Sequence, residues 1–242
     1  MVSSKKVALV TGGNKGIGYA ICRQLAEAGV AVLLGARDAV AGEAAAAALR
    51  EEGLDVRSVA VDVANDASIA AAAERIAADP GRLDILVNNA GISGDHRTVP
   101  SEASLDVMRG IYATNVFGLT AMIQALLPLL RRSPAGRIVN MSTGLASLSL
   151  TAGPEGPFAF SRLLAYNSSK TAVNAITVQF ANELADTSIR INAANPGLCA
   201  TDLSSGKGRP PAEGAAVAVR LALWDEGSPN GILFGDSGKM PW

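Results

Sequence analysis

The sequence predicts a doubly wound α/β fold, in which a seven-stranded parallel sheet carries helices on both faces. Short runs rich in Val, Ile and Leu alternate with longer, Ala-rich periodic segments, as they do in βαβ units. The apolar runs are continuous rather than alternating, which is typical of strands that are covered on both faces. No repeat or linker divides the chain, so we expect a single domain over residues 1–242, a size that open α/β sheets reach as one unit.

The expected elements follow from these two kinds of segment. The apolar runs predict strands over residues 6–12, 30–37, 56–63, 83–91, 136–142, 189–197 and 231–238. The periodic segments predict helices over residues 16–28, 39–52, 67–78, 104–130, 161–185 and 212–224. Crossovers between parallel strands are right-handed, and such a sheet binds its ligands at the carboxyl ends of its strands. The residues that follow each strand are therefore the place to look for function.

The composition favours a small-molecule partner. The formal net charge is −1, and no stretch concentrates Lys or Arg as binding to nucleic acid or to a membrane surface requires. The longest apolar stretches fall short of the roughly 18 residues that cross a bilayer, and the N-terminus lacks the apolar length of a secretory leader. We therefore expect a cytoplasmic protein. Cys22 and Cys199 are too few for a disulfide framework, and no Cys, His and acid grouping has metal-ligand spacing, so no metal is expected.

A glycine-rich turn, TGGNKGIG, follows the first strand and opens the first helix, which is the context of a dinucleotide-phosphate turn. Gly12 permits the tight exit from the strand, Gly16 lets the backbone approach a pyrophosphate, and Gly18 lets helix and strand pack closely. The N–H groups of the helix N-terminus then attract the phosphates. The expected contacts are Gly12, Asn14, Lys15, Gly16, Ile17 and Gly18. Taken alone, the turn has an alternative interpretation as an ordinary glycine-rich loop between a strand and a helix.

The end of the second strand predicts NADP, used as NADPH, rather than NAD. Ala36 stands where an NAD enzyme of this architecture carries an acidic residue for the adenosine-ribose 2′-hydroxyl. Arg37 follows at once, and with Lys15 it is expected to clamp a 2′-phosphate. The alternative is that both are solvated surface charges. Asp38 is the adverse feature, and we expect it to cap the following helix.

A second constellation is typical of hydride-transfer chemistry on a carbonyl. Tyr166 and Lys170 are four residues apart, so they share one face of a helix, and Ser142 closes the apolar run IVNMS. Reduction of a carbonyl creates an alkoxide, which needs an acid and a stabilising donor. We expect Tyr166 to be the acid, Ser142 to be the donor, and Lys170 to lower the pKa of the phenol, which is ordinarily near 10.

These motifs, in this order, resemble the short-chain dehydrogenase/reductase family over essentially the whole chain. The sequence also matches the family at Asp62-Val63, Asn88-Asn89-Ala90-Gly91, Asn115 and Pro196-Gly197. The segments NKGIG and GARD and the terminal Trp242 are most similar to its NADPH-dependent carbonyl reductases. The resemblance implies a Rossmann fold and a nicotinamide cofactor.

The resemblance also implies roles for individual residues. The implied cofactor contacts are Asp62 and Val63 at the adenine, Asn89, Ala90 and Gly91 at the adenosine ribose, Tyr166 and Lys170 at the nicotinamide ribose, and Pro196, Gly197, Leu198, Cys199 and Thr201 at the nicotinamide. Asn115 would hold a water in a proton relay from Lys170. The residues themselves leave other interpretations open. Asp62 could be a turn aspartate, Asn88 or Asn89 a staple for the backbone, and Asn115 a helix kink or a backbone hydrogen bond.

The sequence therefore predicts an oxidoreductase that reduces a ketone or aldehyde with NADPH. The alternatives are reduction of a 3-oxoacyl thioester and a non-catalytic nicotinamide redox sensor. The substrate should meet the loops 93–100, 144–160 and 200–211, whose Leu and Phe side chains favour an apolar or aromatic compound. His96, the only histidine, is expected to be a solvated loop residue.

The spacing of the site predicts a monomer or homodimer. Ser142 and Tyr166 are 24 positions apart, longer than in compact members of the family. The resemblance implies that the Tyr166 helix commonly builds a subunit interface, which an insertion at its start would cover. The outer stripe expected on that helix is small and partly polar, and includes Thr171, Asn174 and Asn182.

Overall fold

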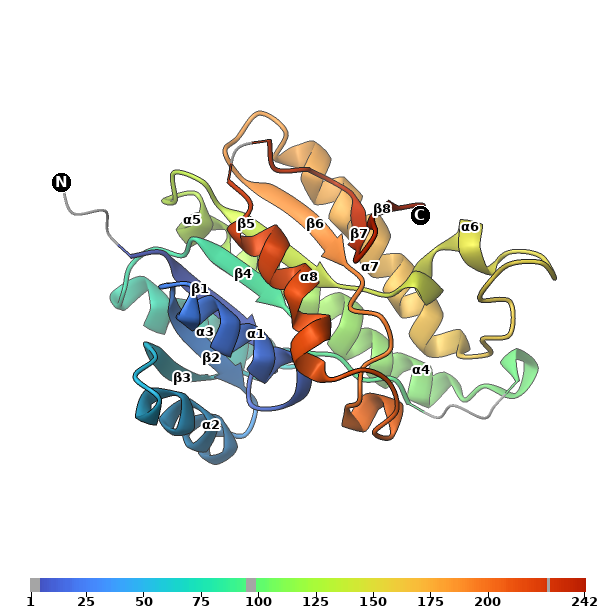
Figure 1. The fold of residues 1–242 in the computed structure, drawn as a ribbon, viewed down its shortest axis with the longest axis horizontal. Coiled ribbons are helices and arrows are strands. Elements are labelled where there is room, and N and C mark those ends of the chain that lie inside the picture. The colour runs from blue at the N-terminus through green and yellow to red at the C-terminus, as the bar shows by residue number, and fades with distance from the viewer. Residues whose placement is uncertain (1–4, 95–98, 226) are drawn as a thin grey trace.

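The structure is a computed structural model that describes residues 5–94, 99–225 and 227–242, so His96 lies outside the described residues. One sheet runs through the molecule, with strand order β3-β2-β1-β4-β5-β6-β7-β8 (Figure 1). Its strands are β1 (Val7–Thr11), β2 (Ala31–Ala36), β3 (Val56–Ala60), β4 (Ile85–Asn88), β5 (Arg137–Met141), β6 (Arg190–Ala194), β7 (Leu233–Gly235) and β8 (Gly238–Met240). The first seven are parallel, which confirms the predicted doubly wound sheet.

The prediction of seven strands needs one correction. The last predicted strand, 231–238, is shorter than expected and turns back, so that β8 pairs antiparallel with β7. Gly235 lies opposite Gly238, and Gly238 has a φ of +108°, a value that glycine adopts readily at a hairpin turn. The residues of β8 form a strand because they pair with β7, and three residues give no periodic signal of their own.

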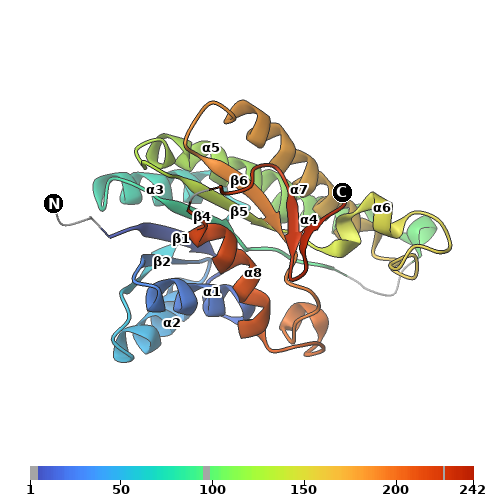
Figure 2. The same ribbon diagram turned by 45° about the horizontal axis from the view of Figure 1, so that its top comes forward.

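Helices cover both faces of the sheet. The helices are α1 (Gly16–Glu27), α2 (Ala39–Glu51), α3 (Asp66–Ala78), α4 (Leu105–Tyr112), α5 (Leu119–Leu130), α6 (Leu148–Thr151), α7 (Leu164–Glu183) and α8 (Pro211–Leu223). Short 3-10 turns are η1 (Pro100–Glu102), η3 (Gly144–Ala146) and η4 (Asp202–Ser204). Figure 2 shows α1, α2 and α8 on one side of the sheet and α3, α5 and α7 on the other. Each layer buries its own apolar core against the sheet.

The helix predicted over residues 104–130 is not regular. A π-helical turn, η2 (Ala113–Gly118), separates α4 from α5. Gly118 is required at this point, because a Cβ there would lie 2.1 Å from the carbonyl oxygen of Val63. Among the described residues, the stretch Leu105–Leu130 is long and apolar enough to cross a membrane by length and composition, contrary to the expectation from the sequence. Half of its most apolar window is buried inside the fold, where α5 packs against α3 and β4.

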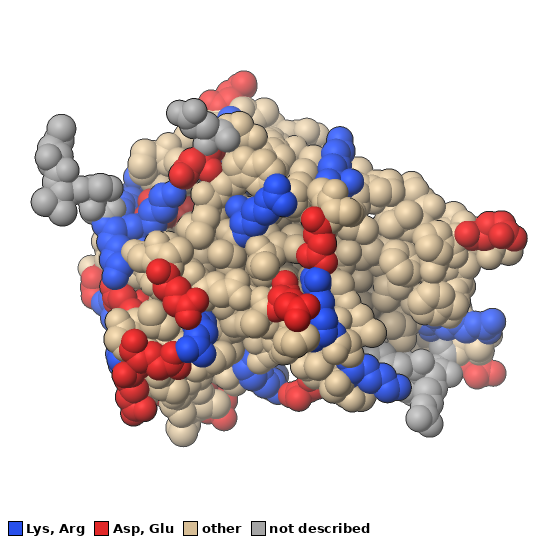
Figure 3. Space-filling view, in the orientation of Figure 1, with Lys and Arg blue, Asp and Glu red and all other residues tan. Residues whose placement is uncertain are grey.

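The arrangement of the strands creates a switch point. The chain runs from β1 outward to β2 and β3 and then returns to β4 on the other side of β1, so neighbouring crossovers leave the sheet in opposite directions. The carboxyl ends of these strands meet at the edge of the sheet nearest α6 (Figure 1). Charged side chains of both signs lie interspersed on the face drawn in Figure 3. A ligand site is therefore expected at the strand ends rather than on a patch of one charge.

Candidate active site

The glycine turn has the geometry of a phosphate cradle. Gly12 and Gly16 have φ values of +62° and +57°, in the left-handed region that favours glycine. A Cβ on Gly18 would lie 2.2 Å from the carbonyl oxygen of Gly12, so only glycine lets α1 begin this close to β1. In the part of the chain that the structure describes, no side chain caps α1. Its first N–H groups are left for a ligand, and an anion fits them.

The two predicted 2′-phosphate ligands differ in their surroundings. Lys15 Nζ lies 2.5 Å from Asp202 Oδ2 in η4. Arg37 is exposed at the end of β2, and its guanidinium has no partner among the described residues. Asp38 Oδ1 accepts the N–H groups of Val40 and Ala41 at 2.9 and 3.1 Å, which confirms it as the cap of α2. Its negative charge is therefore held at the helix N-terminus, and Arg37 is the free cation at this strand end.

The asparagine that follows β4 staples the glycine turn. Asn89 Nδ2 donates to the carbonyl oxygens of Thr11 and Gly12 at 2.9 and 3.1 Å. In return, Thr11 Oγ1 accepts the backbone N–H groups of Asn89 and Ala90, both at 3.0 Å. Of the alternatives left open by the sequence, the structure thus has Asn89 as a backbone staple. The segment fixes the exit of β1 and leaves Ala90 and Gly91 at the strand end.

The aspartate after β3 also shapes its own turn. Asp62 Oδ1 accepts the backbone N–H of Ala64 at 3.0 Å, and the N–H of Asp62 donates to Ser68 Oγ at 2.9 Å. The cap of α3 is Asn65, whose side chain accepts from the N–H of Ser68. Val63 is buried in the apolar core on the α3 and α5 side of the sheet. Asp62 is therefore fixed in orientation at the carboxyl end of the sheet, with Oδ2 free of partners in the described residues.

Helix α7 brings the predicted catalytic residues to the end of β5. Lys170 is buried, and its Nζ donates to the carbonyl oxygen of Met141 at 2.8 Å. That carbonyl adjoins Ser142, which is also buried and whose N–H donates to the carbonyl oxygen of Ala194 at 2.7 Å. Lys170 Nζ lies 6.0 Å from the centre of the Tyr166 ring. Serine, phenol and ammonium are thus anchored around one strand end.

The structure corrects the expected effect of Lys170 on the phenol. Burial raises the pKa of Tyr166 to about 12, and burial lowers the pKa of Lys170 to about 8. The ammonium does not lower the phenol's pKa here, because it is bound to the Met141 carbonyl and stands 6.0 Å from the ring centre. Desolvation disfavours the charged form of each group and outweighs their attraction. At neutral pH the phenol therefore keeps its proton.

Asn115 lies in the π turn and is fully buried. Its Oδ1 accepts the N–H of Ile92 at 2.9 Å, while its Nδ2 donates to the carbonyl oxygen of Ile92 at 2.8 Å and to Ser169 Oγ at 3.1 Å. A Cβ on Gly91 would lie 3.3 Å from Asn115 Oδ1 and 3.5 Å from Lys170 Nζ. The kink and the backbone hydrogen bonds are both present, so Asn115 ties the segment after β4 to α7 beside Lys170.

The segment after β6 folds over the glycine turn. Gly197 has a φ of +67°, and its N–H donates to Asn195 Oδ1 at 3.1 Å. Cys199 is buried, with Sγ 3.3 Å from the carbonyl oxygen of Pro196, while Leu198 is exposed. Thr201 comes close to the turn, because a Cβ on Gly16 would lie 3.2 Å from its Cγ2. The segment predicted to contact the nicotinamide, Pro196 to Thr201, therefore forms a rim beside the glycine turn predicted to contact the pyrophosphate.

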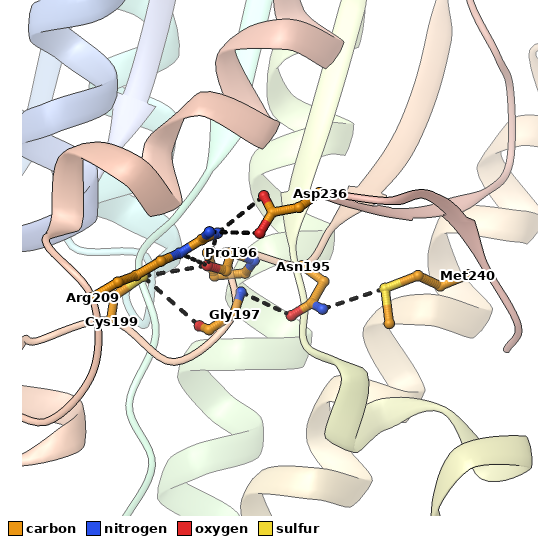
Figure 4. A network of polar contacts seen from close by, with 7 residues as sticks. All are labelled: Asn195, Pro196, Gly197, Cys199, Arg209, Asp236 and Met240. Carbon is orange, nitrogen blue, oxygen red and sulfur yellow. Dashed lines mark hydrogen bonds and ion pairs between the residues drawn. The ribbon is translucent and has the colours of Figure 1, made fainter. Parts of the chain in front are cut away.

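A network around this segment was not predicted from the sequence (Figure 4). Arg209 donates to the carbonyl oxygen of Pro196 from Nε at 3.1 Å and from Nη2 at 2.6 Å, and it forms a bidentate pair with Asp236. Asn195 Nδ2 donates to Met240 Sδ at 3.3 Å. The β7–β8 hairpin thus holds the rim at two points. No spacing in the sequence indicates it, because 27 positions separate Arg209 from Asp236.

The expectation from the sequence placed Asn174 wrongly. It is buried rather than part of the outer stripe of α7, and its Oδ1 accepts a hydrogen bond from Ser142 Oγ at 2.6 Å. Thr171, from the same expected stripe, donates to the carbonyl oxygen of Ala146 in η3 at 2.9 Å. The signal that could have placed Asn174 inward is its spacing, one turn beyond Lys170 and two beyond Tyr166.

A cavity of about 110 Å³ lies on the Tyr166 side of the site, between α4 and the start of α7. Apolar side chains of Val107, Ile111 and Leu164 contribute to its wall. Among the described residues of the predicted substrate loops, only Ser93 lines this cavity. No residue of the described 144–160 loop lines this cavity, and within that loop a Cβ on Gly144 would lie 2.8 Å from the Phe158 ring. The α4 wall was not predicted, because its residues precede Tyr166 by more than fifty positions.

Comparisons with known proteins agree with this geometry. The family model for short chain dehydrogenases matches residues 6–211. A short-chain dehydrogenase of Penicillium roqueforti is 37% identical over 239 residues, covering 96% of this chain and 93% of its own length. Carbonyl reductase (NADPH) 1 of Mus musculus is 33% identical over 284 residues and covers 100% of both chains. The solved structure of salutaridine reductase from Papaver somniferum superposes with a TM-score of 0.83 at 28% identity, covering 96% of this chain and 100% of that one.

Proposed function

Because the chain belongs to the short-chain dehydrogenase/reductase family, we propose that it is an NADPH-dependent reductase of ketones or aldehydes, with residues 1–242 acting as one cofactor-binding domain. The observation that carries the proposal is the anchoring of Tyr166 and Lys170 around the strand end that bears Ser142. A protein that only bound the cofactor would have no use for an acid, a cation and a hydroxyl at one point.

The chemistry of the reduction divides among these side chains. The glycine turn and the rim from Pro196 to Thr201 would hold a reduced nicotinamide cofactor, which would supply hydride to the carbonyl carbon. Ser142 stabilises the negative charge that develops on the carbonyl oxygen, and Tyr166 gives that oxygen its proton. Burial raises the pKa of Tyr166 to about 12, so at neutral pH the phenol carries the proton that the carbonyl oxygen would receive. Lys170 fixes the strand end through Met141 and contributes positive charge when protonated.

The residues present fit a nicotinamide dinucleotide. The glycine turn offers uncapped N–H groups to the pyrophosphate, and the rim from Pro196 to Thr201 would enclose the nicotinamide. Arg37, without a partner in the described structure, supports a 2′-phosphate, hence NADPH. The name of the mouse relative, which includes NADPH, supports the same choice. Asp62, with its carboxylate held in the turn, would contact the adenine side.

The test is a substrate panel followed as loss of NADPH absorbance. Aldehydes, quinones, aryl ketones and 3-oxoacyl thioesters are compared, and we expect turnover of an apolar carbonyl compound. The Tyr166→Phe variant keeps the ring but has no proton to give, so kcat should fall by roughly 10²–10⁴-fold while NADPH still binds. Preferred turnover of a thioester would select the 3-oxoacyl alternative. NADPH binding with no turnover of any panel member would favour the redox sensor.

We further propose a cytoplasmic monomer or homodimer. The η3 turn packs on α7 through the Thr171 hydroxyl, and Asn167 Nδ2 donates to Ser161 Oγ at 2.9 Å. The segment before α7 therefore covers part of the helix that the family commonly uses as an interface. Light scattering at micromolar concentration should give a mass of one or two chains, and a stable tetramer would contradict this.

A further inference from the structure

Asn174 completes a stripe on α7 that faces the end of β5. Tyr166, Lys170 and Asn174 follow one another at intervals of four residues, which places them on one face of the helix. Lys170 holds the Met141 carbonyl, and Asn174 holds the next residue, Ser142, through its hydroxyl. One turn further, Thr177 Oγ1 accepts from Asn140 Nδ2 at 2.9 Å. Three consecutive residues of the strand end are thus each bound by one turn of α7.

In this arrangement the polar groups of Ser142 and Asn174 are not all hydrogen-bonded. Ser142 and Asn174 are only 3% and 4% exposed, so neither side chain has access to bulk water. The Ser142 hydroxyl donates its single proton to Asn174 Oδ1, while the buried Asn174 Nδ2 has no partner among the described residues. A buried amide nitrogen without an acceptor is costly. A hydroxyl that has given its proton to Oδ1 has only lone pairs left for a second contact.

The opposite orientation of the carboxamide gives Nδ2 an acceptor and frees the serine's proton. A half-turn about the Cβ–Cγ bond exchanges the amide oxygen and nitrogen within nearly the same volume. Nδ2 then donates to Ser142 Oγ, and the hydroxyl proton is released from the asparagine. A developing alkoxide next to Ser142 needs that proton as a hydrogen-bond donor. The donor orientation therefore gives the buried Nδ2 an acceptor and leaves the serine's proton available for the substrate oxygen, while Oδ1 takes the buried position that Nδ2 held.

We propose that Asn174 is a positioning residue that donates its amide N–H to Ser142 Oγ and thereby directs the serine's proton to the substrate oxygen. Asn174 does not touch the reacting atoms, because both of its polar atoms lie behind Ser142 and are buried. Its role rests on the proposed reductase function, in which Ser142 is the donor to the carbonyl oxygen. It adds a residue to the site that acts only through another.

The first experiment is a double-mutant cycle on the intact protein, with the best substrate of the panel and NADPH. Asn174→Leu keeps the volume but offers no donor, and we expect kcat to fall roughly 10- to 100-fold, with little change in the NADPH dissociation constant. In the Ser142→Ala background the same substitution should change kcat by less than about twofold, because its target is gone. Ser133→Ala is the matched control, because it removes a buried hydrogen bond to Asp84 Oδ1 just before β4, at the opposite end of the sheet, and it should leave kcat unchanged. Thermal unfolding of each variant reports its folding separately.

The second experiment reads the direction of the hydrogen bond. Asn174→Asp introduces a carboxyl that only accepts when ionised and so retains the serine's proton. Its kcat should rise relative to that of the wild type as the pH falls from about 7 to 5, where the carboxyl gains a proton to donate and Lys170, with a pKa of about 8, is already protonated in both proteins. Equal losses from Asn174→Leu with and without Ser142, or an Asn174→Asp profile parallel to wild type, would overturn the inference. A wild type that binds NADPH but turns over no substrate would instead refute the proposed function. The two outcomes are distinct, because the cycle compares kcat values and requires a wild type with measurable turnover.

Discussion

Lys15 Nζ lies 2.5 Å from Asp202 Oδ2, so an ion pair joins the glycine turn to the η4 turn beyond β6. The hydrogen bond from Lys15 lowers the pKa of Asp202, which is therefore ionised at neutral pH. The two side chains are 70% and 80% exposed, and solvent weakens ion pairs in such a setting. The pair therefore holds Lys15 only weakly and competes with any anion that the glycine turn attracts.

The first prediction concerns Asp202→Asn, which removes the competing carboxylate but keeps the shape of the side chain. If Lys15 contacts a 2′-phosphate, the affinity for NADPH should rise by up to about fivefold, while the affinity for NADH should not change. Fluorescence titration of the two reduced cofactors measures both. An equal gain for both cofactors would mean that Lys15 contacts a part that they share.

The second prediction concerns the choice of cofactor. Arg37 is the cation without a partner in the described structure, so it should contribute more than Lys15 to a 2′-phosphate site. One charge-assisted bond from each contributes about 1.5–3 kcal/mol, which favours NADPH by more than about a hundredfold in kcat/KM. Arg37→Ala loses one of these bonds and should therefore lower the preference for NADPH roughly tenfold or more. A wild-type ratio near one would contradict the assignment, as would an Arg37→Ala variant whose ratio equals that of the wild type.

The sheet and the site were predicted from the sequence to different depths. The seven parallel strands, the glycine turn and the Asp38 cap follow from patterns local to one segment, and the structure has them. The contacts of Arg209 with Asp236 and of Ser142 with Asn174 join segments far apart in the chain, where no local pattern operates. The pKa of the Tyr166 phenol also depends on its surroundings in the folded protein. Spacing places Lys170 near Tyr166, but only the structure shows that both are desolvated.

The third prediction is a titration of the phenol in the protein without ligand. Burial raises the pKa of Tyr166 to about 12, so its phenolate should form only well above neutral pH. The difference in phenolate absorbance between the wild type and Tyr166→Phe isolates this residue from the other two tyrosines. We expect no difference below about pH 10, the ordinary value for a phenol. A phenolate that appeared near pH 8 would show that Lys170 lowers the pKa of the phenol after all.

The fourth prediction links Lys170 to stability. Burial lowers its pKa from 10.5 to about 8, so between these values the unfolded chain holds a proton that the folded protein lacks. Stability therefore rises with pH across this window, by at most about 1.4 kcal/mol per pH unit. Tyr166 opposes this above pH 10, where the folded protein retains the phenol proton that the unfolded chain loses. The effect of Lys170 on stability should therefore be measured between pH 8 and 10.

Denaturant unfolding of the wild type and of Lys170→Met tests that linkage. The free energy of unfolding of the wild type should gain on that of the variant as the pH rises from 8 to 10, because methionine has no proton to release. A constant difference across the range would mean that Lys170 keeps an ordinary pKa in the folded protein.

The last prediction compares a helix glycine that has no room for a side chain, Gly18, with one that has room, Gly110. A Cβ on Gly18 would lie 2.2 Å from the carbonyl oxygen of Gly12, so Gly18→Ala must push α1 away from the glycine turn. We expect a loss of stability of at least about 1–3 kcal/mol, as for other overpacked sites, together with weaker NADPH binding, because the phosphate cradle is displaced with the helix. Gly110, inside α4, is the matched control, since a Cβ there meets nothing within 4 Å. Gly110→Ala should raise stability by up to about 1 kcal/mol through its higher helix propensity and leave cofactor binding unchanged. Denaturant unfolding and NADPH titration of both variants test this prediction. If Gly18→Ala were as stable as the wild type and bound NADPH as tightly, the close contact between α1 and the glycine turn would not determine the shape of the phosphate cradle.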